Sequence, residues 1–238
     1  LIVCGGGIVQ DIGAFVSAIY KRGIPWILLP STLLSMCDSC IGGKTGINYN
    51  KVKNQLALFS APRQVIIFSE FIKTLQEREI KSGLGEILKL FVTGGRTLLD
   101  VFESEVQGDK VQDFTSYKKL ILGALGVKKQ IIEADEFELN LRKSLNYGHT
   151  LGHAIEVLSD YDIPHGQAVS LGMIIVDRLS TLNGLLPEEE RLQLKKLAMP
   201  LSDHKKLTLD VVKNLPDLLR NDKKAKGNTL TFSLSGDC

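Results

Sequence analysis

The chain has 238 residues, of which 44% are hydrophobic and 24% are charged, and its formal net charge is +2. These values are ordinary for a globular protein with one large or two modest domains, and they do not favour nucleic-acid binding, so any basic site must be local. The sequence has no run of 18 or more apolar residues, and we therefore predict no membrane span.

The first residues, LIVCGGG, are typical of a buried strand that runs directly into a glycine turn. A lone strand needs neighbours and the chain has no initiator Met, so we expect a preceding portion of a longer protein. The stretch GGGIVQD at residues 5–11 then opens a helix, as a pyrophosphate-binding turn does. Gln10 stands where the pattern G-x-G-x-x-G has its third glycine, so an ordinary tight turn is the alternative.

Two kinds of pattern divide the chain. Residues 1–70 alternate apolar, strand-like runs with one helical stretch, as in LIVC, IVQDIGAFVSAIYKRG, IPWILLP and QVIIFS, which is typical of a parallel α/β sheet. Residues 71–238 are almost entirely helical in pattern, apart from a short final strand, NTLTFSL. The predicted fold class is α/β plus α, with part of a parallel-sheet domain followed by a helical domain.

Four cysteines are too few for a secreted disulfide scaffold and indicate a reducing compartment. Cys37 and Cys40 form a C-x-x-C, but a zinc site would need a second ligand pair at similar spacing, and none follows. A metal or redox role and a role as small buried residues remain the alternatives.

The stretch IGGKTGIN at residues 41–48 is similar to the end of a P-loop. Asp38 stands where the first glycine should be, and the following INYNKVKNQ does not open a helix, so a Walker A loop is not predicted. The glycines still indicate close approach of the backbone to a ligand, and Lys44 supplies a charge for a phosphate. Lys53 and Asn54 extend this candidate anion site, and a solvated turn is the alternative.

The stretch GLGEILKLF places Glu86 and Lys89 three residues apart in a strongly apolar helix. A surface ion pair is the default interpretation of such spacing. The apolar neighbours would instead bury much of the helix, and buried charges need partners or a metal.

Polar residues recur with helical spacing in the middle of the chain. If the helix extends back from His153, then Arg142, Asn146, His149, His153 and Glu156 lie within a sector of roughly 80°. A solvent-facing polar stripe is the alternative. The glycine before each histidine argues against it, because two glycines four residues apart usually indicate close packing or ligand approach.

His165 opens the next helix and is expected to be exposed after Pro164. The pair His149 and His153 is not an H-E-x-x-H motif, because Thr150 stands where the general base would be. A glutamate from another helix would join two of the three histidines in a His₂Glu set with open positions, the ligand pattern of a catalytic zinc. A shared metal, a division of roles and no chemical role are all open at this point.

Taken together, these segments resemble the 3-dehydroquinate synthase family, a group of sugar-phosphate cyclases. The resemblance runs from residue 1 to about residue 222 and is carried in order by GGGIVQDIGAF, YKRG, PSTLL, DSCIGGKTGIN, KNQLALF, SGLGEILK, LNYGHTLGHAIE and HGQAVSLGM. Members are longer and have an N-terminal segment that completes the sheet. The resemblance implies that residues 1–70 are the C-terminal part of a Rossmann-like NAD domain and residues 71–238 a metal- and substrate-binding domain.

The implied activity is that of a cytoplasmic, NAD- and divalent-metal-dependent lyase of the shikimate pathway, which serves aromatic amino-acid biosynthesis. It would convert 3-deoxy-D-arabino-heptulosonate 7-phosphate to 3-dehydroquinate and phosphate. The metal would be zinc, with cobalt as an alternative. Neither nucleic acid nor a membrane is an expected partner.

The resemblance also implies roles for single residues. The metal ligands would be Glu86, His149 and His165. Arg22 would reach the phosphate bound by the neighbouring subunit of a homodimer. Further substrate contacts would be Lys44, Asn54, Lys89, Lys128, Arg142, Asn146, His153 and, as the late lysine of the set, Lys223. The cofactor contacts would be Gly7, Ile8, Val9, Gln10, Asp11, Ser31, Thr32, Asp38, Lys44, Lys53, Phe71, Ile72, Lys73 and Thr74.

Departures from the family pattern keep the substrate open. The family usually has glycine at Gln10, threonine at Ser31 and glutamate at Gln167, and none of these changes removes an implied ligand. The rival functions are another sugar-phosphate cyclase of amino-dehydroquinate, 2-epi-5-epi-valiolone or deoxy-inosose type, a related polyol dehydrogenase, and a truncated non-catalytic fragment.

Overall fold

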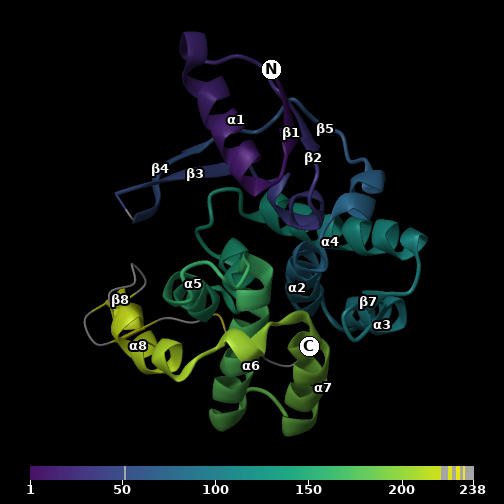
Figure 1. The fold of residues 1–238 in the computed structure, drawn as a ribbon, viewed down its shortest axis with the longest axis vertical. Coiled ribbons are helices and arrows are strands. Elements are labelled where there is room, and N and C mark those ends of the chain that lie inside the picture. Colours follow the sequence, from purple (N-terminus) through teal and green to yellow (C-terminus); the bar gives the residue numbers. More distant parts are fainter. Residues whose placement is uncertain (51, 221–224, 227–228, 231–232, 234–238) are drawn as a thin grey trace.

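The computed structural model describes residues 1–50, 52–220, 225–226, 229–230 and 233. The N-terminal part is a three-stranded parallel sheet with the order β1 (Ile2–Gly5), β2 (Ile27–Pro30), β5 (Gln64–Val65). Helix α1 (Gly7–Ile19) follows β1 directly and packs beside the sheet (Figure 1). The strand, glycine turn and helix predicted for the first residues are thus confirmed.

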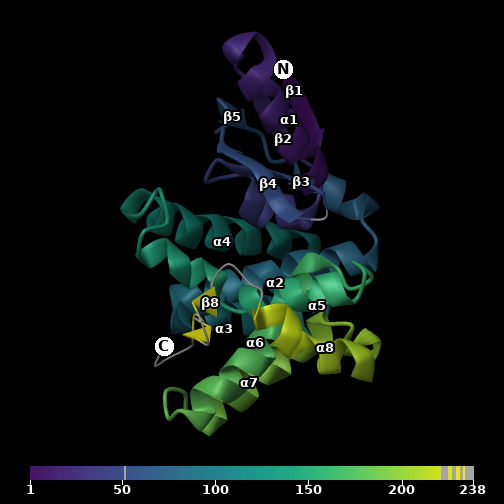
Figure 2. The same ribbon diagram turned by 90° about the vertical axis from the view of Figure 1, so that its left-hand side faces the viewer.

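A β-hairpin outside the parallel sheet separates β2 from β5 in the chain. After β2 the chain forms a π-helical turn, η2 (Ser35–Ser39), and then the antiparallel strands β3 (Lys44–Tyr49) and β4 (Val52–Phe59). The segment that resembles a P-loop is therefore a strand, which agrees with the prediction that it is no Walker A loop. Figures 1 and 2 show this hairpin between the parallel sheet and the helical part, and Lys44 is the first residue of β3.

The rest of the chain is helical apart from short hairpins. Its helices are α2 (Glu77–Gly94), α3 (Arg96–Glu105), α4 (Phe114–Ala134), α5 (His149–Leu158), α6 (His165–Leu182), α7 (Glu188–Ala198) and α8 (Leu209–Arg220). Short 3₁₀ turns are η1 (Tyr20–Arg22), η3 (Ser69–Thr74), η4 (Leu141–Asn146), η5 (Met199–Leu201) and η6 (His204–Lys206). The small hairpins are β6 (Val106–Gln107) with β7 (Lys110–Val111), and β8 (Ala225–Lys226) with β9 (Thr229–Leu230). Of the predicted final strand at residues 228–234, the structure describes only residues 229–230 and 233. The rest of this prediction lies outside the described residues.

Helix α2 is the centre of the helical part. Residues 82–92 are all buried, so the helix is surrounded by its neighbours α3, α4 and α6. Such a helix must be apolar on every side, and the charged exceptions Glu86 and Lys89 are thereby forced into the interior. A separate small core beneath the sheet contains Trp26 and Leu28. Among the described helices, none is both long and apolar enough to cross a membrane.

Glycines bring the central helices unusually close together. A Cβ on Gly166 of α6 would lie 1.8 Å from the carbonyl oxygen of Ser82 in α2, and one on Gly172 would lie 2.1 Å from the carbonyl of Gly148. Any side chain at either position would push α6 away from its neighbours. The close contact of α2, α5 and α6 is what allows side chains from all three helices to meet.

Candidate functional site

Glu86 and Lys89 form an ion pair in the interior. Their side chains are 0% and 2% exposed, and Lys89 Nζ lies 2.9 Å from Glu86 Oε2. Burial alone would raise the pKa of Glu86, but the positive charge of Lys89 and the two adjacent imidazoles outweigh burial and hold it well below its usual range. The prediction that this pair is buried is confirmed, and both groups are kept charged by each other.

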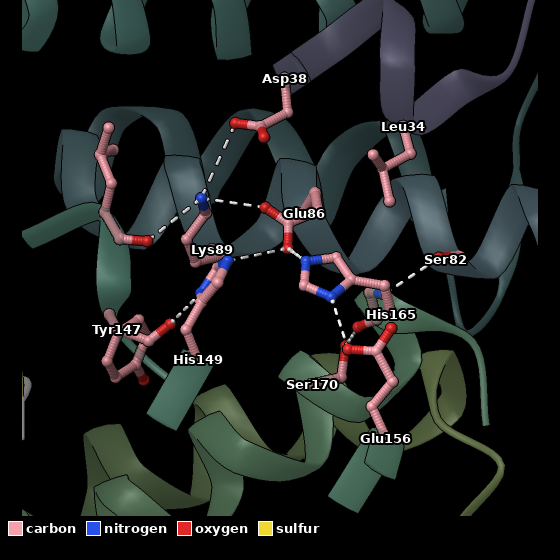
Figure 3. A network of polar contacts seen from close by, with 12 residues as sticks. Leu34, Asp38, Ser82, Glu86, Lys89, Tyr147, His149, Glu156, His165 and Ser170 are labelled. Carbon is pink, nitrogen blue, oxygen red and sulfur yellow. Dashed lines mark hydrogen bonds and ion pairs between the residues drawn. The ribbon is translucent and has the colours of Figure 1, made fainter. Parts of the chain in front are cut away.

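Two histidines face the other oxygen of Glu86. His149 Nε2 from α5 and His165 Nε2 from α6 lie 3.5 Å and 3.4 Å from Glu86 Oε1, which accepts no hydrogen bond of regular geometry from the described residues (Figure 3). A buried carboxylate oxygen without a donor is costly unless a cation neutralises it. One carboxylate and two imidazoles are also a common donor set for catalytic zinc, so these residues fit a divalent metal.

His153 completes a cluster of imidazoles. Its ring centroid lies 5.3 Å from those of both His149 and His165, and ligand atoms of the three rings lie within 4.8 Å of one another. Geometry alone therefore allows a three-histidine set as well as the set with Glu86. The buried, unsatisfied Glu86 Oε1 favours the latter, and it leaves His153 beside the metal. We call Glu86, His149, His153 and His165 the metal half of the site.

The Nδ1 atoms of His149 and His165, on the side of each ring away from Glu86, also have hydrogen-bond partners. His149 Nδ1 lies 3.1 Å from the carbonyl oxygen of Tyr147, and His165 Nδ1 lies 3.3 Å from Glu156 Oε2. Burial lowers the pKa of His149 to about 4, whereas for His165 the hydrogen bonds and charges of Glu156 and Glu86 outweigh burial and raise the pKa to about 9. Two carboxylates therefore make this point of the site favourable for positive charge.

The predicted continuous helix from Arg142 to Glu156 is wrong. Helix α5 begins at His149, and Gly148 before it has a φ of 72°, a left-handed conformation that ends the short helix η4 and redirects the chain. Arg142 and Asn146 lie on η4, so they do not share a helical stripe with the histidines. His165 opens α6 as predicted, but its side chain is only 27% exposed because α2 and α5 pack around it.

A second buried ion pair extends the metal half. Asp38 Oδ1 lies 3.1 Å from Lys128 Nζ and 3.8 Å from Lys89 Nζ, and Lys128 also donates to the main-chain carbonyl of Asp38 at 2.6 Å. Burial would raise the pKa of Asp38, but the two ammonium groups outweigh burial and lower it. The structure thus brings together Asp38, Lys89 and Lys128, three residues from separate elements that the resemblance places around substrate and cofactor.

Two of the predicted phosphate contacts, Lys44 and Asn146, both contact the carboxylate of Glu138. Glu138, in the loop before η4, forms an ion pair with Lys44 and accepts a hydrogen bond from Asn146 Nδ2 at 2.8 Å. Arg142 is buried nearby, where it donates to the carbonyls of Glu136 and Gly42. We call Lys44, Glu138, Arg142 and Asn146 the anion half of the site.

Glu138 has two unusual properties. Its φ is 62°, a conformation that costs a non-glycine residue about 1–3 kcal/mol. Burial would raise its pKa, but the hydrogen bonds from Lys44 and Asn146 outweigh burial and lower it. The contacts with Lys44 and Asn146 therefore keep Glu138 ionised as a hydrogen-bond acceptor, in a backbone conformation that is unfavourable for a non-glycine residue.

The candidate nucleotide turn lies at the start of α1. The N-cap Gly6 offers no side-chain acceptor to the first turn, and a Cβ on Gly7 would meet open space. Gln10 exchanges hydrogen bonds with Ser39, and Asp11 Oδ1 accepts from Thr45 Oγ1 at 3.1 Å. The open helix start suits a pyrophosphate, while Gln10 and Asp11 tie α1 to η2 and β3.

In the motif G-x-G-x-x-G, the third glycine allows the helix to pack closely against the strand. In this chain Gly13 has that role. A Cβ there would lie 2.5 Å from Val3 of β1. Gln10 in the third glycine position is therefore compatible with a close βα turn.

Further predicted cofactor contacts flank this turn. The main-chain N–H of Ser31 donates to Gly5, and Thr32 exchanges hydrogen bonds with Ser35. The predicted contacts Ile8 and Val9 are exposed on α1. The four residues 71–74 lie on η3, where Ile72 is buried in the helical core and Thr74 Oγ1 donates to the carbonyl of Phe71. Lys73 Nζ lies over the ring of Phe114, 4.6 Å from its centroid, so this segment packs on the helical part.

Four predicted contacts remain: Asn54, Arg22 and Lys223 for the substrate, and Lys53 for the cofactor. Asn54 lies on β4 with its side chain over Gly46 of β3. Arg22 is exposed at the end of η1 with a φ of 67°. Lys53 lies on β4, and its side chain is outside the described residues, as is the whole of Lys223.

Cys37 and Cys40 have buried thiols that contact main-chain carbonyls. Cys37 Sγ lies 3.5 Å from the carbonyl oxygen of Leu34, and Cys40 Sγ lies 3.4 Å from the carbonyl oxygen of Met36. Burial raises the pKa of Cys37 well above its usual range and that of Cys40 to about 12. Protonated, enclosed thiols agree with the interpretation of the pair as small buried residues.

The sequence analysis assigns no role to two residues of the site. Glu138 carries no local signal, because its partner Lys44 lies 94 positions away in the chain. Glu156 lies on the predicted polar stripe, and its spacing of seven residues from His149, which puts both on one face of α5, is a usable signal for a role at the site.

Comparisons with known proteins show the family of the chain. Residues 1–82 match the family model described as 3-dehydroquinate synthase N-terminal, and residues 83–225 match 3-dehydroquinate synthase C-terminal. A 3-dehydroquinate synthase from Streptococcus pyogenes serotype M49 (strain NZ131) is 44% identical over 191 residues, which are 80% of this chain and 53% of that protein. The chain thus spans about half the length of this curated relative.

Solved structures share the fold. A 2-deoxy-scyllo-inosose synthase complexed with carbaglucose-6-phosphate, NAD⁺ and Co²⁺ is similar with a TM-score of 0.88 at 24% identity, covering 99% of this chain and 66% of that one. A 2-epi-5-epi-valiolone synthase from Streptomyces hygroscopicus subsp. jinggangensis 5008, with NAD⁺ and Zn²⁺ bound, has a TM-score of 0.82 at 25% identity and covers 100% and 68%. The predicted fold class, an α/β part followed by a helical part, is confirmed.

Proposed function

The chain belongs to the 3-dehydroquinate synthase family, and from that premise we propose that it converts 3-deoxy-D-arabino-heptulosonate 7-phosphate to 3-dehydroquinate and phosphate. The observation that carries the proposal is the meeting of Glu86, His149 and His165 around one buried carboxylate oxygen. It supports a divalent metal held by these three residues. The metal we propose is zinc, and cobalt is the alternative, since the two solved relatives were described with Zn²⁺ and Co²⁺.

When bound, the metal would supply Lewis-acid polarisation of a substrate hydroxyl and NAD would supply a hydride acceptor. Lys89 is held charged 2.9 Å from Glu86, because Glu86 and Asp38 outweigh burial and raise its pKa. An ammonium group fixed in this way stabilises negative charge on a nearby substrate oxygen without reorganisation. His153 lies beside both ligand imidazoles and is placed to hold or pass a proton there.

The anion half supplies the phosphate contacts in this proposal. Lys44, Asn146 and the buried Arg142 offer the donors, and Glu138 contacts two of them. A phosphate that enters would compete with the Glu138 carboxylate for Lys44 and Asn146, because two anions beside the same donors repel each other. Elimination of phosphate later in the reaction would allow Glu138 to return, which favours product release.

The NAD part of the proposal rests on the open start of α1 and on the family. The boundary between the NAD domain and the metal domain near residue 70 stays a prediction, and the family models divide at residue 82 instead. A homodimer in which Arg22 reaches the neighbouring site, and a cytoplasmic location, likewise remain proposals.

Substrate choice decides between this function and its rival. A 2-deoxy-scyllo-inosose synthase and a 2-epi-5-epi-valiolone synthase share the fold with TM-scores of 0.88 and 0.82, so another cyclase activity is the second candidate. The test supplies NAD and zinc and measures phosphate release from heptulosonate phosphate and from sedoheptulose phosphate. Turnover of sedoheptulose phosphate alone would favour the rival.

Truncation needs its own control. Release of phosphate by a longer form of the protein, but not by the 238-residue chain, would show that these residues form the site without being sufficient for turnover.

A further inference from the structure

We propose that Glu156 is a positioning residue for the metal site, whose carboxylate orients the His165 imidazole toward the metal. The proposal rests on the metal site of the proposed function and assigns a role to a residue that is not among the proposed metal ligands or substrate contacts. Its basis is the contact of 3.3 Å between Glu156 Oε2 and His165 Nδ1, deep between α5 and α6 (Figure 3).

The two nitrogens of His165 face different carboxylates. Nε2 faces Glu86 Oε1 at 3.4 Å, and Nδ1 on the other side of the ring faces Glu156. A carboxylate that accepts the Nδ1 proton fixes the tautomer with its lone pair at Nε2 and increases the basicity of that nitrogen. Glu156 therefore keeps the metal-binding nitrogen directed at Glu86.

His165 needs such support more than His149 does. The Nδ1 of His149 lies against the main-chain carbonyl of Tyr147, which no side-chain change removes. His165 is the first residue of α6, so no preceding helical turn packs against its ring, and its side chain is 27% exposed compared with 13% for His149. The Nδ1 contact of His165 thus depends on a side chain that a substitution can remove, whereas that of His149 does not.

Burial and helix geometry make Glu156 suitable for this role. Its side chain is 12% exposed, and it lies two helical turns after His149 on the same face of α5. One helix therefore carries a metal ligand and the carboxylate that orients a ligand of the next helix. The close α5–α6 contact at Gly152 and Gly172 fixes the spacing between them.

The test measures metal affinity of the metal-free 238-residue chain by competition with a chelator, using Zn²⁺ and Co²⁺. We expect Glu156→Gln, which keeps an acceptor oxygen and loses the charge, to bind about tenfold more weakly than wild type. Glu156→Ala should bind up to about 100-fold more weakly. The Co²⁺ absorption spectrum should change in Glu156→Ala, which a purely structural role would not require.

Controls separate positioning from folding. Glu105→Gln changes another hydrogen-bonded glutamate, which contacts Ser116 and Lys119, and it should leave metal affinity unchanged. Glu156→Asp should retain more affinity than Glu156→Ala, and the melting temperature of each metal-free variant shows whether it is folded. Should Glu156→Ala fail to fold, Glu156→Gln and Glu156→Asp still carry the test.

Affinities within twofold of wild type in the folded Glu156 variants, with an unchanged Co²⁺ spectrum, would overturn the proposal. A wild-type chain that binds neither metal would overturn it as well. Turnover is measured separately, on the 238-residue chain and on a longer form of the protein. Glu156-dependent metal binding without turnover of any sugar phosphate by either form would refute the proposed function and leave this inference standing.

Discussion

The metal half and the anion half of the site are built in contrasting ways. Glu86, His149 and His165 project from three helices that glycines hold in close contact, and Glu86 is completely buried. Lys44 and Glu138 lie on a strand end and a loop, with side chains 46% and 26% exposed. The contrast shows that the metal half is arranged by packing, whereas in the anion half a carboxylate of the protein occupies Lys44 and Asn146, for which a bound anion would compete.

The largest expected effect tests which residues make up the metal half. Glu86→Ala, His149→Ala and His165→Ala should each lose bound metal, because each removes one of three donors. His153→Ala should retain it. Metal analysis of the purified proteins after dialysis distinguishes the outcomes, and loss of metal in His153→Ala would show that the three histidines are the ligand set.

The next effect tests whether packing arranges the metal half. Gly166→Ala should destabilise the chain by about 1–3 kcal/mol or more, because its Cβ would meet the carbonyl of Ser82 and separate α6 from α2. Denaturant unfolding measures the loss, and metal affinity should fall with it.

Gly126→Ala is the matched control for that substitution. Gly126 is also in a helix, but a Cβ there meets nothing within 4 Å, so the change should stabilise α4 by up to about 1 kcal/mol. If both alanine variants unfold at the same denaturant concentration, the helix contact at Gly166 does not determine the site.

A smaller effect tests the counter-ion of the anion half. Glu138→Gln should bind inorganic phosphate more tightly, by about three- to tenfold, because the anion no longer competes with a carboxylate for Lys44 and Asn146. Lys44→Gln should bind it more weakly. Calorimetric titration with phosphate gives both values, and weaker binding by Glu138→Gln would mean that Glu138 supports the ligand instead of competing with it.

The smallest expected effect concerns acid stability. The pKa of Glu138 is lowered in the folded chain, so its ion pair contributes stability above the ordinary glutamate pKa of about 4.3, and that stability is lost as the pH falls through the lowered value. Glu138→Gln should therefore have a shallower loss of unfolding free energy below about pH 4. Equal slopes in wild type and variant would show that the contact with Lys44 is not maintained in solution.

Local pattern was sufficient for much of this protein. The strand, turn and helix at residues 2–19 follow from LIVCGGGIVQD, because turn chemistry and periodicity act over a few residues. The burial of Glu86 and Lys89 followed from their apolar neighbours. The resemblance is what predicts the identity of the metal ligands. Periodicity alone indicates three candidate histidines and does not say which glutamate joins them.

Tertiary structure decided what joins these pieces. The left-handed Gly148 separates η4 from α5, which helical spacing of polar residues had merged into one stripe. The contacts of Glu138 with Lys44 and of Glu86 with His149 and His165 join positions far apart in the chain, and no local period encodes them. The sequence by itself determined which groups are present, and the close packing of α2, α5 and α6 determined which of them meet, because side-chain contact depends on helix separation.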